Sequence, residues 1–355
     1  MKKKAFSQIK EILHDAKKGK MFILVDDGDR ENEGDLVIPG SKCNSKNINF
    51  MAKHGRGLIC LALTSKKVKK LNLPLMSSVN KSRTQTAFTV SIESKTGIST
   101  GISAHDRAKT IKVAIKPDSN RHNIVSPGHV FPLVAKDGGV LERAGHTEAS
   151  VDISKLAKLN PSAVICEVMN EDGTMARYKD LILFSKKHRL KIAKIEDLIS
   201  HRLRNEKLIK CISNKKMKIK KFGNFDLKTF RNKLDGSEHY AITKGKFTRS
   251  KASRVRVIST NVLNSFFNFN KDIFKNSLKH LNKFNNFALV LVKGTNPNPA
   301  SSENNKILRY YGIGAQIIKE LKIRKMILVS RSIKRVIALD GYGIKITKQE
   351  IMKWK

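Results

Sequence analysis

The sequence predicts two layered α/β domains of the α+β type, the second smaller than the first. Three observations lead to this prediction. The chain has 355 residues, enough for two domains that each bury a core. Short apolar runs typical of β-strands alternate with helical patterns along it. A lysine-rich tract at residues 205–221 separates two such series and indicates a linker between domains at 1–204 and 222–355.

The alternation predicts each element in order. In the first domain we expect helices at residues 6–17, 104–114, 146–159 and 195–204, and strands at 21–25, 36–38, 57–63, 86–92 and 162–168. In the second domain, short strand-like runs precede a helix at 311–321, a strand at 326–329 and a helix at 332–339. No internal repeat is visible.

Composition excludes several classes of protein. The apolar runs are far shorter than the ~20 residues of a membrane-spanning helix, and charged residues interrupt the N-terminal segment too early for a secretory signal. The four cysteines form no C-x-x-C pair, which is typical of free thiols in a reducing compartment. We therefore expect a cytoplasmic protein without a membrane partner.

The basic charge has a less specific meaning. The formal net charge is +41, and residues 205–355 hold 34 Lys and Arg against 9 Asp and Glu. These cations are spread along the chain, and no nucleic-acid-binding motif or aromatic cluster accompanies them. We interpret them as solvated surface that can attract phosphorylated small molecules, and we expect no nucleic-acid partner.

Against this background the stretch at residues 26–35, DDGDRENEGD, has six acidic residues in ten. It follows directly on the predicted strand at 21–25. One interpretation is a solvated acidic turn. The other is a site for Mg²⁺ or Mn²⁺, which bind carboxylate oxygens and leave positions for substrate oxygens. The spacing does not match a calcium-binding loop. We call this stretch the acidic loop.

A second pattern, RAGHTE, begins at Arg143 and opens a predicted helix. Arg143 offers a bidentate fork for phosphate, Gly145 permits close backbone approach, His146 can bind a metal, and Thr147 can donate to an anion at the helix N-terminus. The alternative is a capped helix with a surface arginine.

Two isolated residues are also candidates. His129, in PGHVFP, can act as a general acid or base, although such a histidine is more often structural. Glu167 interrupts the apolar run SAVICEV, where a carboxylate costs several kcal/mol unless it has a partner.

The chain resembles 3,4-dihydroxy-2-butanone 4-phosphate synthase, an enzyme of riboflavin biosynthesis. The motifs DRENEGD, HGRGLICLALT, TGISAHDRAKT, PGHVFPL, RAGHTEASVDI and CEVMNEDGTMAR occur in the family's order over residues 5–203. The resemblance implies the fold of that family, a magnesium- or manganese-dependent lyase that converts D-ribulose 5-phosphate to 3,4-dihydroxy-2-butanone 4-phosphate and formate, and a homodimer with residues of both subunits near each site.

The resemblance also implies roles for individual residues. Glu31 and His146 would bind the metal, and His129 and Glu167 would be essential to catalysis. Substrate contacts would come from Arg30, Glu31, Asp35, Arg143, Ala144, Gly145, His146, Thr147 and Glu167. Supporting roles would fall to Glu33, Cys60, Thr100, Ser103, Asp106 and Arg107. Gly28 stands where the family commonly has Glu, which removes a carboxylate from the acidic loop without changing a predicted ligand.

The second domain resembles GTP cyclohydrolase II over residues 215–346, with YYGIGAQII and LDGYG as its best-matched stretches. The family's zinc-binding cysteines are absent, since no cysteine follows Cys211, so a thiolate zinc site cannot form. We therefore expect no zinc and a domain that is inactive as a cyclohydrolase. Two alternatives stay open: a bifunctional enzyme that also hydrolyses GTP, and a basic module that binds nucleic acid or protein.

Overall fold

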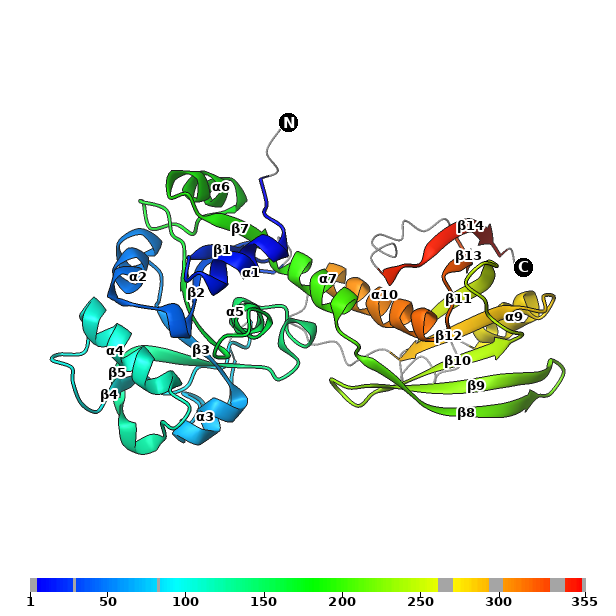
Figure 1. The fold of residues 1–355 in the computed structure, drawn as a ribbon, viewed down its shortest axis with the longest axis horizontal. Coiled ribbons are helices and arrows are strands. Elements are labelled where there is room, and N and C mark those ends of the chain that lie inside the picture. The colour runs from blue at the N-terminus through cyan, green and yellow to red at the C-terminus, as the bar shows by residue number, and fades with distance from the viewer. Residues whose placement is uncertain are drawn as a thin grey trace. The chain divides into compact units, whose positions relative to one another are not determined.

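The computed structural model describes residues 5–27, 30–81, 84–260, 271–293, 303–332 and 342–352. The chain divides inside helix α7 (Ile195–Asn205) into two compact units, residues 1–199 and a second unit that begins at residue 200. Each unit is built on its own mixed sheet (Figure 1). In the described part of the chain, no helix combines the length and the apolar character that a membrane span requires.

The sheet of the first unit has seven strands in the order β4-β5-β3-β6-β2-β1-β7. β1 pairs parallel with β7 and β3 pairs parallel with β5, while the other neighbours are antiparallel. The strands are β1 (Phe22–Val25), β2 (Gly34–Pro39), β3 (Cys60–Thr64), β4 (Ile92–Ser94), β5 (Ile124–Ala135), β6 (Ser162–Glu167) and β7 (Lys191–Lys194).

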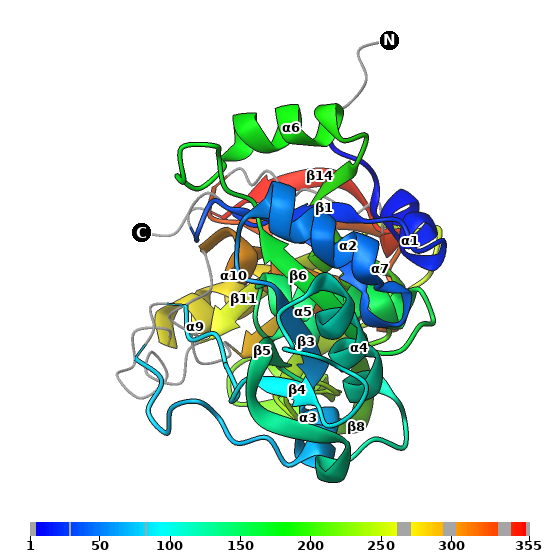
Figure 2. The same cartoon turned by 90° about the vertical axis from the view of Figure 1, so that its left-hand side faces the viewer.

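Helices cover both faces of this sheet (Figures 1 and 2). They are α1 (Ile9–Lys17), α2 (Ser45–Phe50), α3 (Ser65–Leu71), α4 (Ala104–Ile115), α5 (His146–Leu156) and α6 (Tyr178–Lys187). Strand alternation separates the two faces. Leu61 and Leu63 of β3 join the core with Ile48 of α2 and Ile111 of α4, whereas the intervening Ala62 packs with Val151 of α5.

Most of the predicted elements of the first domain are present. The predicted strand at 86–92 is largely wrong: that segment forms isolated bridges at Phe88 and Thr89, and β4 begins only at Ile92. The twelve-residue strand β5 was not predicted, because Pro127 and Pro132 interrupt its apolar pattern. Helices α2, α3 and α6 were also missed.

The second unit has a seven-stranded sheet in the order β14-β13-β11-β12-β10-β9-β8, parallel from β14 to β12 and antiparallel from β12 to β8. Its helices are α9 (Lys271–Leu281) and α10 (Glu303–Glu320). Its strands are β8 (Ile209–Ile219), β9 (Gly223–Asn232), β10 (Glu238–Lys244), β11 (Ser253–Thr260), β12 (Phe287–Lys293), β13 (Lys325–Ser330) and β14 (Lys345–Ile351).

The prediction of a linker at residues 205–221 was wrong. This tract contains β8, which pairs with β9 along its whole length, from Ile209 opposite Asn232 to Ile219 opposite Gly223. Its lysines are exposed because β8 is an edge strand, and charged edges discourage pairing with other chains. The predicted helix at 311–321 and strand at 326–329 lie in α10 and β13. The predicted helix at 332–339 lies almost entirely outside the described residues.

Candidate active site

Strand register brings the predicted carboxylates to one face of the first sheet. Asp35 of β2 is directly opposite Leu24 of β1 on one side and Glu167 of β6 on the other. Leu36 and Cys166 belong to the core that contains α2 and α4, so Asp35 and Glu167 must point to the opposite face, on which α5 packs. Extending the register of β3 places Leu58 in the same row, and that of β5 adds His129.

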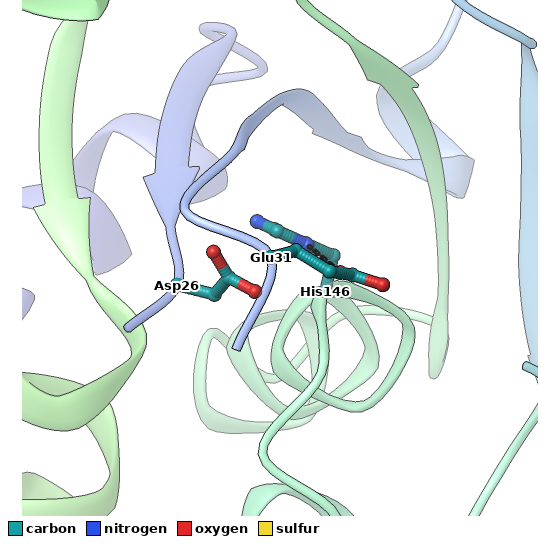
Figure 3. Close-up of side chains that lie close together, drawn as sticks. All are labelled: Asp26, Glu31 and His146. Atoms are coloured by element: carbon teal, nitrogen blue, oxygen red, sulfur yellow. Dashed lines mark ion pairs between the residues drawn. The ribbon is translucent and has the colours of Figure 1, made fainter. Parts of the chain in front are cut away.

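The acidic loop crosses the start of α5 and forms a cluster there. Ligand atoms of Asp26, Glu31 and His146 all lie within 4.8 Å of one another, and Figure 3 shows these side chains where the loop passes the first turn of the helix. Nδ1 of His146 lies 4.0 Å from a carboxylate oxygen of Glu31 and 3.7 Å from one of Asp35. Asp26, absent from the predicted ligands, therefore joins the two that were predicted.

Arg30 partly neutralises this cluster. Its Nη1 atom donates to Oδ2 of Asp26 at 2.7 Å and also donates to Glu31. Although burial opposes the protonated form, the charges of Glu31 and Asp26 raise the pKa of Arg30 above its usual value. Arg30 thus stays charged and fixes the two carboxylates relative to each other.

Burial disfavours the ionised form of the other carboxyl groups, Asp35, Glu167 and Glu33. Burial, together with the charges of Glu167 and Glu31, raises the pKa of Asp35 well above its usual value. Burial also raises the pKa of Glu167 and of Glu33. The five acidic groups Asp26, Glu31, Glu33, Asp35 and Glu167 lie in a small, mostly buried volume, and a bound cation would offset their mutual repulsion.

These residues fit a divalent metal. Nε2 of His146 is buried and has no hydrogen-bond partner in the described structure, and burial lowers the pKa of this histidine, which keeps a lone pair available. Carboxylate oxygens with one imidazole are ligands that Mg²⁺ and Mn²⁺ accept. The geometry thus supports the predicted ligands Glu31 and His146 and adds Asp26.

Arg143 stabilises the RAGHTE turn, but its guanidinium is not free to bind a phosphate through two nitrogens as the sequence suggested. Nη1 of Arg143 donates to Oε2 of the buried Glu148 at 2.6 Å, and Nη2 donates to Thr84 O and Thr86 Oγ1, each at 3.0 Å. Every terminal nitrogen therefore already has a partner. A Cβ on Gly145 would collide with this guanidinium, so the turn requires glycine. Ala144 and Thr147 are buried beside it.

The two predicted catalytic residues, His129 and Glu167, have different hydrogen-bond partners. Nδ1 of His129 is hydrogen-bonded to Oε1 of Glu93 on β4, and the His129 side chain is 43% exposed. Glu167 accepts a hydrogen bond from the backbone N–H of Leu58 at 2.8 Å. A Cβ on Gly57 would lie 2.6 Å from Oε2 of Glu167, so this glycine makes room for the carboxylate.

The supporting residues of the TGISAHDR motif form a capped loop. Asp106 accepts hydrogen bonds from Ser99 Oγ at 2.8 Å and Gly101 N at 3.1 Å, and these bonds lower its pKa. Ser103 caps α4 by accepting from the Asp106 backbone at 3.0 Å. Thr100 is exposed in this loop, and Nε of Arg107 is buried with no hydrogen bond in the described structure.

The same loop packs against the hydrogen-bonded pair of His129 and Glu93, since a Cβ on Gly101 would collide with Glu93 and lie 2.8 Å from His129 Nδ1. Cys60 is buried in β3, and burial raises the pKa of its thiol. The charges of Glu167 and Asp35 also raise the pKa of this thiol, so Cys60 lines the site as an uncharged side chain.

Sequence reasoning missed three site residues. Asp26 lies in the acidic loop, and the sequence assigned it no role. The only signal for it was the alternation of side chains along β1, which turns Leu24 and Asp26 away from the core residues Ile23 and Val25. Glu93 had no signal, since its partner His129 comes from another strand. Glu148 stood in the RAGHTE pattern with its partner Arg143 but had no assigned role.

Comparison with known proteins identifies both domains. A family model of 3,4-dihydroxy-2-butanone 4-phosphate synthase matches residues 10–201. A family model of GTP cyclohydrolase II matches residues 210–283 and 275–350. Riboflavin biosynthesis protein RibBA of Aquifex aeolicus (strain VF5) is 42% identical over 377 residues, which cover 98% of this chain and 93% of that protein. The 3,4-dihydroxy-2-butanone 4-phosphate synthase of Photobacterium phosphoreum is 42% identical over 96% of this chain and 98% of that protein.

Solved structures agree. The crystal structure of RibBX, a two-domain 3,4-dihydroxy-2-butanone 4-phosphate synthase from A. baumannii, has a TM-score of 0.83 and 38% identity and covers 98% of this chain and all of that one. A 3,4-dihydroxy-2-butanone 4-phosphate synthase in complex with two magnesium ions covers 56% of this chain and 98% of its own at TM-score 0.54 and 37% identity. The chain therefore belongs to the 3,4-dihydroxy-2-butanone 4-phosphate synthase family of riboflavin biosynthesis, and its enzyme domain is followed by a domain of the GTP cyclohydrolase II type.

Proposed function

We propose that the first domain converts D-ribulose 5-phosphate to 3,4-dihydroxy-2-butanone 4-phosphate and formate with a divalent cation, Mg²⁺ or Mn²⁺, bound by Glu31, His146 and Asp26. One observation carries the proposal. Ligand atoms of these three residues lie within 4.8 Å of one another, and the buried Nε2 atom of His146 has no hydrogen-bond partner in the described structure. The magnesium-bound relative supports the choice of cation.

The reaction removes a proton next to a ketone, forms an enediolate, shifts the carbon skeleton and releases one carbon as formate. A bound divalent cation acts as a Lewis acid that lowers the cost of negative charge on the substrate oxygens. The chain's own residues orient the polyol: Arg30 holds the carboxylates of Asp26 and Glu31 in place. Asp35, whose side chain faces the same side of the sheet, accepts hydrogen bonds from substrate hydroxyls.

Proton transfers fall to Glu167 and His129. The raised pKa of Glu167 lets it hold or release a proton nearer neutral pH than an ordinary carboxyl. His129 moves a proton at Nε2, because its Nδ1 atom is engaged by Glu93. The buried Cys60 excludes water from the sheet side of the site.

The substrate phosphate binds at the N-terminus of α5, where Thr147 presents its backbone N–H group and Gly145, whose own N–H donates to Arg143 O at 2.9 Å, leaves room for close approach. Arg143 contributes positive charge there, while its hydrogen bonds to Glu148, Thr84 and Thr86 hold the turn. Arg107, with its unpartnered Nε, and the exposed hydroxyls of Thr100 and Ser103 are further candidates for phosphate contacts.

We propose that two copies of the chain assemble as a homodimer. Several large apolar side chains of the first unit are exposed, and in the described part of the chain no hydrogen bond or ion pair joins the His129–Glu93 pair to the cluster at His146. A partner copy would cover the apolar surface and bring its own residues near the site. The exposed side chains are Leu58, Leu75, Met76, Val79, Ile102, Val125 and Leu183.

The second domain is proposed to be inactive as a GTP cyclohydrolase. Its single cysteine, Cys211, is an exposed residue of β8. His239 is fully buried, and its Nδ1 already accepts a hydrogen bond from Lys293 N at 3.1 Å. His280 is engaged with Glu350 at 2.6 Å. These residues offer no thiolate set for zinc.

A bifunctional enzyme is the competing function. It is favoured by the match of the GTP cyclohydrolase II model and by a relative from Oryza sativa named as a probable bifunctional riboflavin biosynthesis protein, which is 36% identical over 96% of this chain. A role of the second domain in binding nucleic acid or protein rests only on its basic charge.

One paired assay on the full chain tests these proposals. Ribulose 5-phosphate with Mg²⁺ is expected to yield formate, and a chelator is expected to stop it. GTP with added Zn²⁺ is expected to yield neither formate nor pyrophosphate. Turnover of GTP would establish the bifunctional alternative, and lack of formate from ribulose 5-phosphate would refute the proposed reaction.

A further inference from the structure

Arg177 contacts the acidic loop from a distant part of the chain. Its Nη1 atom donates to the carbonyl oxygens of Glu31 at 2.7 Å and Asn32 at 3.0 Å. The same atom lies 3.5 Å from Oε1 of Glu33. One guanidinium therefore contacts three consecutive residues of the loop, the first of which carries a proposed cation ligand.

The loop needs an external support at this point. Asn32 has a φ of +55°, a left-handed conformation that few residues other than glycine adopt and that asparagine adopts more readily than most. The ends of the loop are tied to each other, since Asp26 N donates to Glu33 O at 3.2 Å and Glu33 N donates to Asp26 Oδ1 at 2.9 Å. In the described part of the chain, the carbonyls of Glu31 and Asn32 accept no backbone N–H.

Arg177 is itself fixed at its backbone. Its N–H donates to Oδ2 of Asp180 at 2.9 Å, which caps α6. The preceding residue, Ala176, donates to Val168 O at 3.0 Å, and Val168 N donates to Gly34 O at 2.9 Å. Arg177 thus connects the acidic loop to the segment that directly follows Glu167.

We propose that Arg177 is a positioning residue that holds the turn at Glu31 and Asn32 and thereby presents the Glu31 carboxylate to the cation. It is not a ligand, because its contacts are with the backbone of the loop. The inference rests on the proposed function, since it assumes that Glu31 binds a divalent cation. Replacement of a residue that orients a metal ligand without binding the metal itself commonly lowers metal affinity by about 10–100-fold.

The test is a titration of the metal-free full chain with Mn²⁺ alone, followed by the electron paramagnetic resonance signal of free Mn²⁺. Glu31→Gln is expected to abolish specific binding. Arg177→Gln is expected to weaken it about tenfold or more, and Arg177→Lys, which keeps a charged donor, is expected to recover part of the loss. Lys179→Gln removes an exposed charge from the same helix and is the matched control with unchanged affinity.

Hydrogen exchange separates positioning from general support of the fold. In Arg177→Gln, amides of residues 30–34 are expected to exchange faster while the strands of the sheet are unchanged. Faster exchange throughout the first domain, or Mn²⁺ binding equal to that of wild type, would overturn the inference. Unchanged Mn²⁺ binding in Glu31→Gln would instead refute the proposed metal site, so the two failures are distinguishable.

Discussion

At the scale of single residues, the carboxylates of the site oppose folding. The pKa of Asp35 is raised by burial and by the charges of Glu167 and Glu31. A folded-state pKa above the unfolded value means that ionisation is less favourable in the folded protein. The resulting loss of stability begins as pH rises through the ordinary pKa of an aspartate, about 3.9, and is complete above the raised pKa.

Asp35→Asn is therefore expected to stabilise the metal-free protein while reducing activity. At pH 7 removal of the buried charge should raise the unfolding free energy and Tm. The gain should shrink as pH falls towards 4. Thermal unfolding at several pH values measures it, with the exposed Asp118→Asn as the control. A lower Tm in Asp35→Asn at pH 7 would contradict the assignment.

Gly145 is expected to tolerate no side chain. In Gly145→Ala the new methyl group would collide with the guanidinium of Arg143, which is fixed by Glu148. Overpacking of this kind costs about 1–3 kcal/mol, and displacement of the turn should reduce formate release. Gly173→Ala, whose Cβ would meet no neighbour within 4 Å, has only the cost of its φ of +86° and should retain activity. Equal activity in both variants would exclude a requirement for glycine at position 145.

Glu93 is expected to orient His129. Glu93→Gln removes the negative charge that fixes the proton on Nδ1, so the rate constant kcat should fall by about 10²-fold, a typical contribution of acid–base catalysis. The pH profile of kcat should shift, whereas Tm should change little. Glu171→Gln, at a side chain that is 80% exposed, is the control. An unchanged pH profile would show that the contact has no part in proton transfer.

At the scale of secondary structure, the elements around the site were predictable where the pattern was regular. The apolar run of β1, the helix that opens after RAGHTE and the run that ends at Glu167 all lie where the sequence placed them. β5 could not be predicted, because its pairing with β3 outweighs the two prolines. The bridges at residues 88 and 89 replaced a predicted strand for the same reason: tertiary pairing decides short segments.

The site residues likewise divide into those that the sequence predicted and those that depend on tertiary packing. Motif order alone led to Glu31 and His146, which the structure brings together. Asp26 required knowledge of which face of β1 the helix α5 covers. The contacts of Arg143 with Thr84 and Thr86 could not be read from the sequence, because they join segments that are far apart in the chain.

The edge strand β8 should resist proteolysis despite its lysines. A linker is cut readily, whereas a paired strand must first separate from its neighbour. Brief native digestion with trypsin is therefore expected to spare Lys215, Lys216 and Lys218, which pair with β9. Met217→Pro, which cannot complete the ladder, should make the same bonds sensitive. Early cleavage of the wild-type chain at these lysines would favour the linker interpretation.

At the scale of the whole molecule, the two domains differ in the chemistry that their residues can perform. The first gathers carboxylates, an imidazole whose Nε2 atom has no partner in the described structure, and a helix N-terminus on one face of its sheet. Among the described residues of the second domain, Cys211 is exposed, His239 of β10 accepts a hydrogen bond from Lys293 N, and His280 of α9 pairs with Glu350. Sequence families alone do not distinguish a catalytic second domain from an inactive one, and the ligand chemistry supports the proposal that this domain is inactive as a cyclohydrolase.

The most direct test of the account is formate release from ribulose 5-phosphate by the full chain and by two variants, Glu31→Gln and His146→Ala, at saturating Mg²⁺. Both variants are expected to fold, as judged by unfolding transitions with the cooperativity of the wild type, and to release formate at least about 10³-fold more slowly. Full activity in either folded variant would contradict the assignment of the cation site to Asp26, Glu31 and His146.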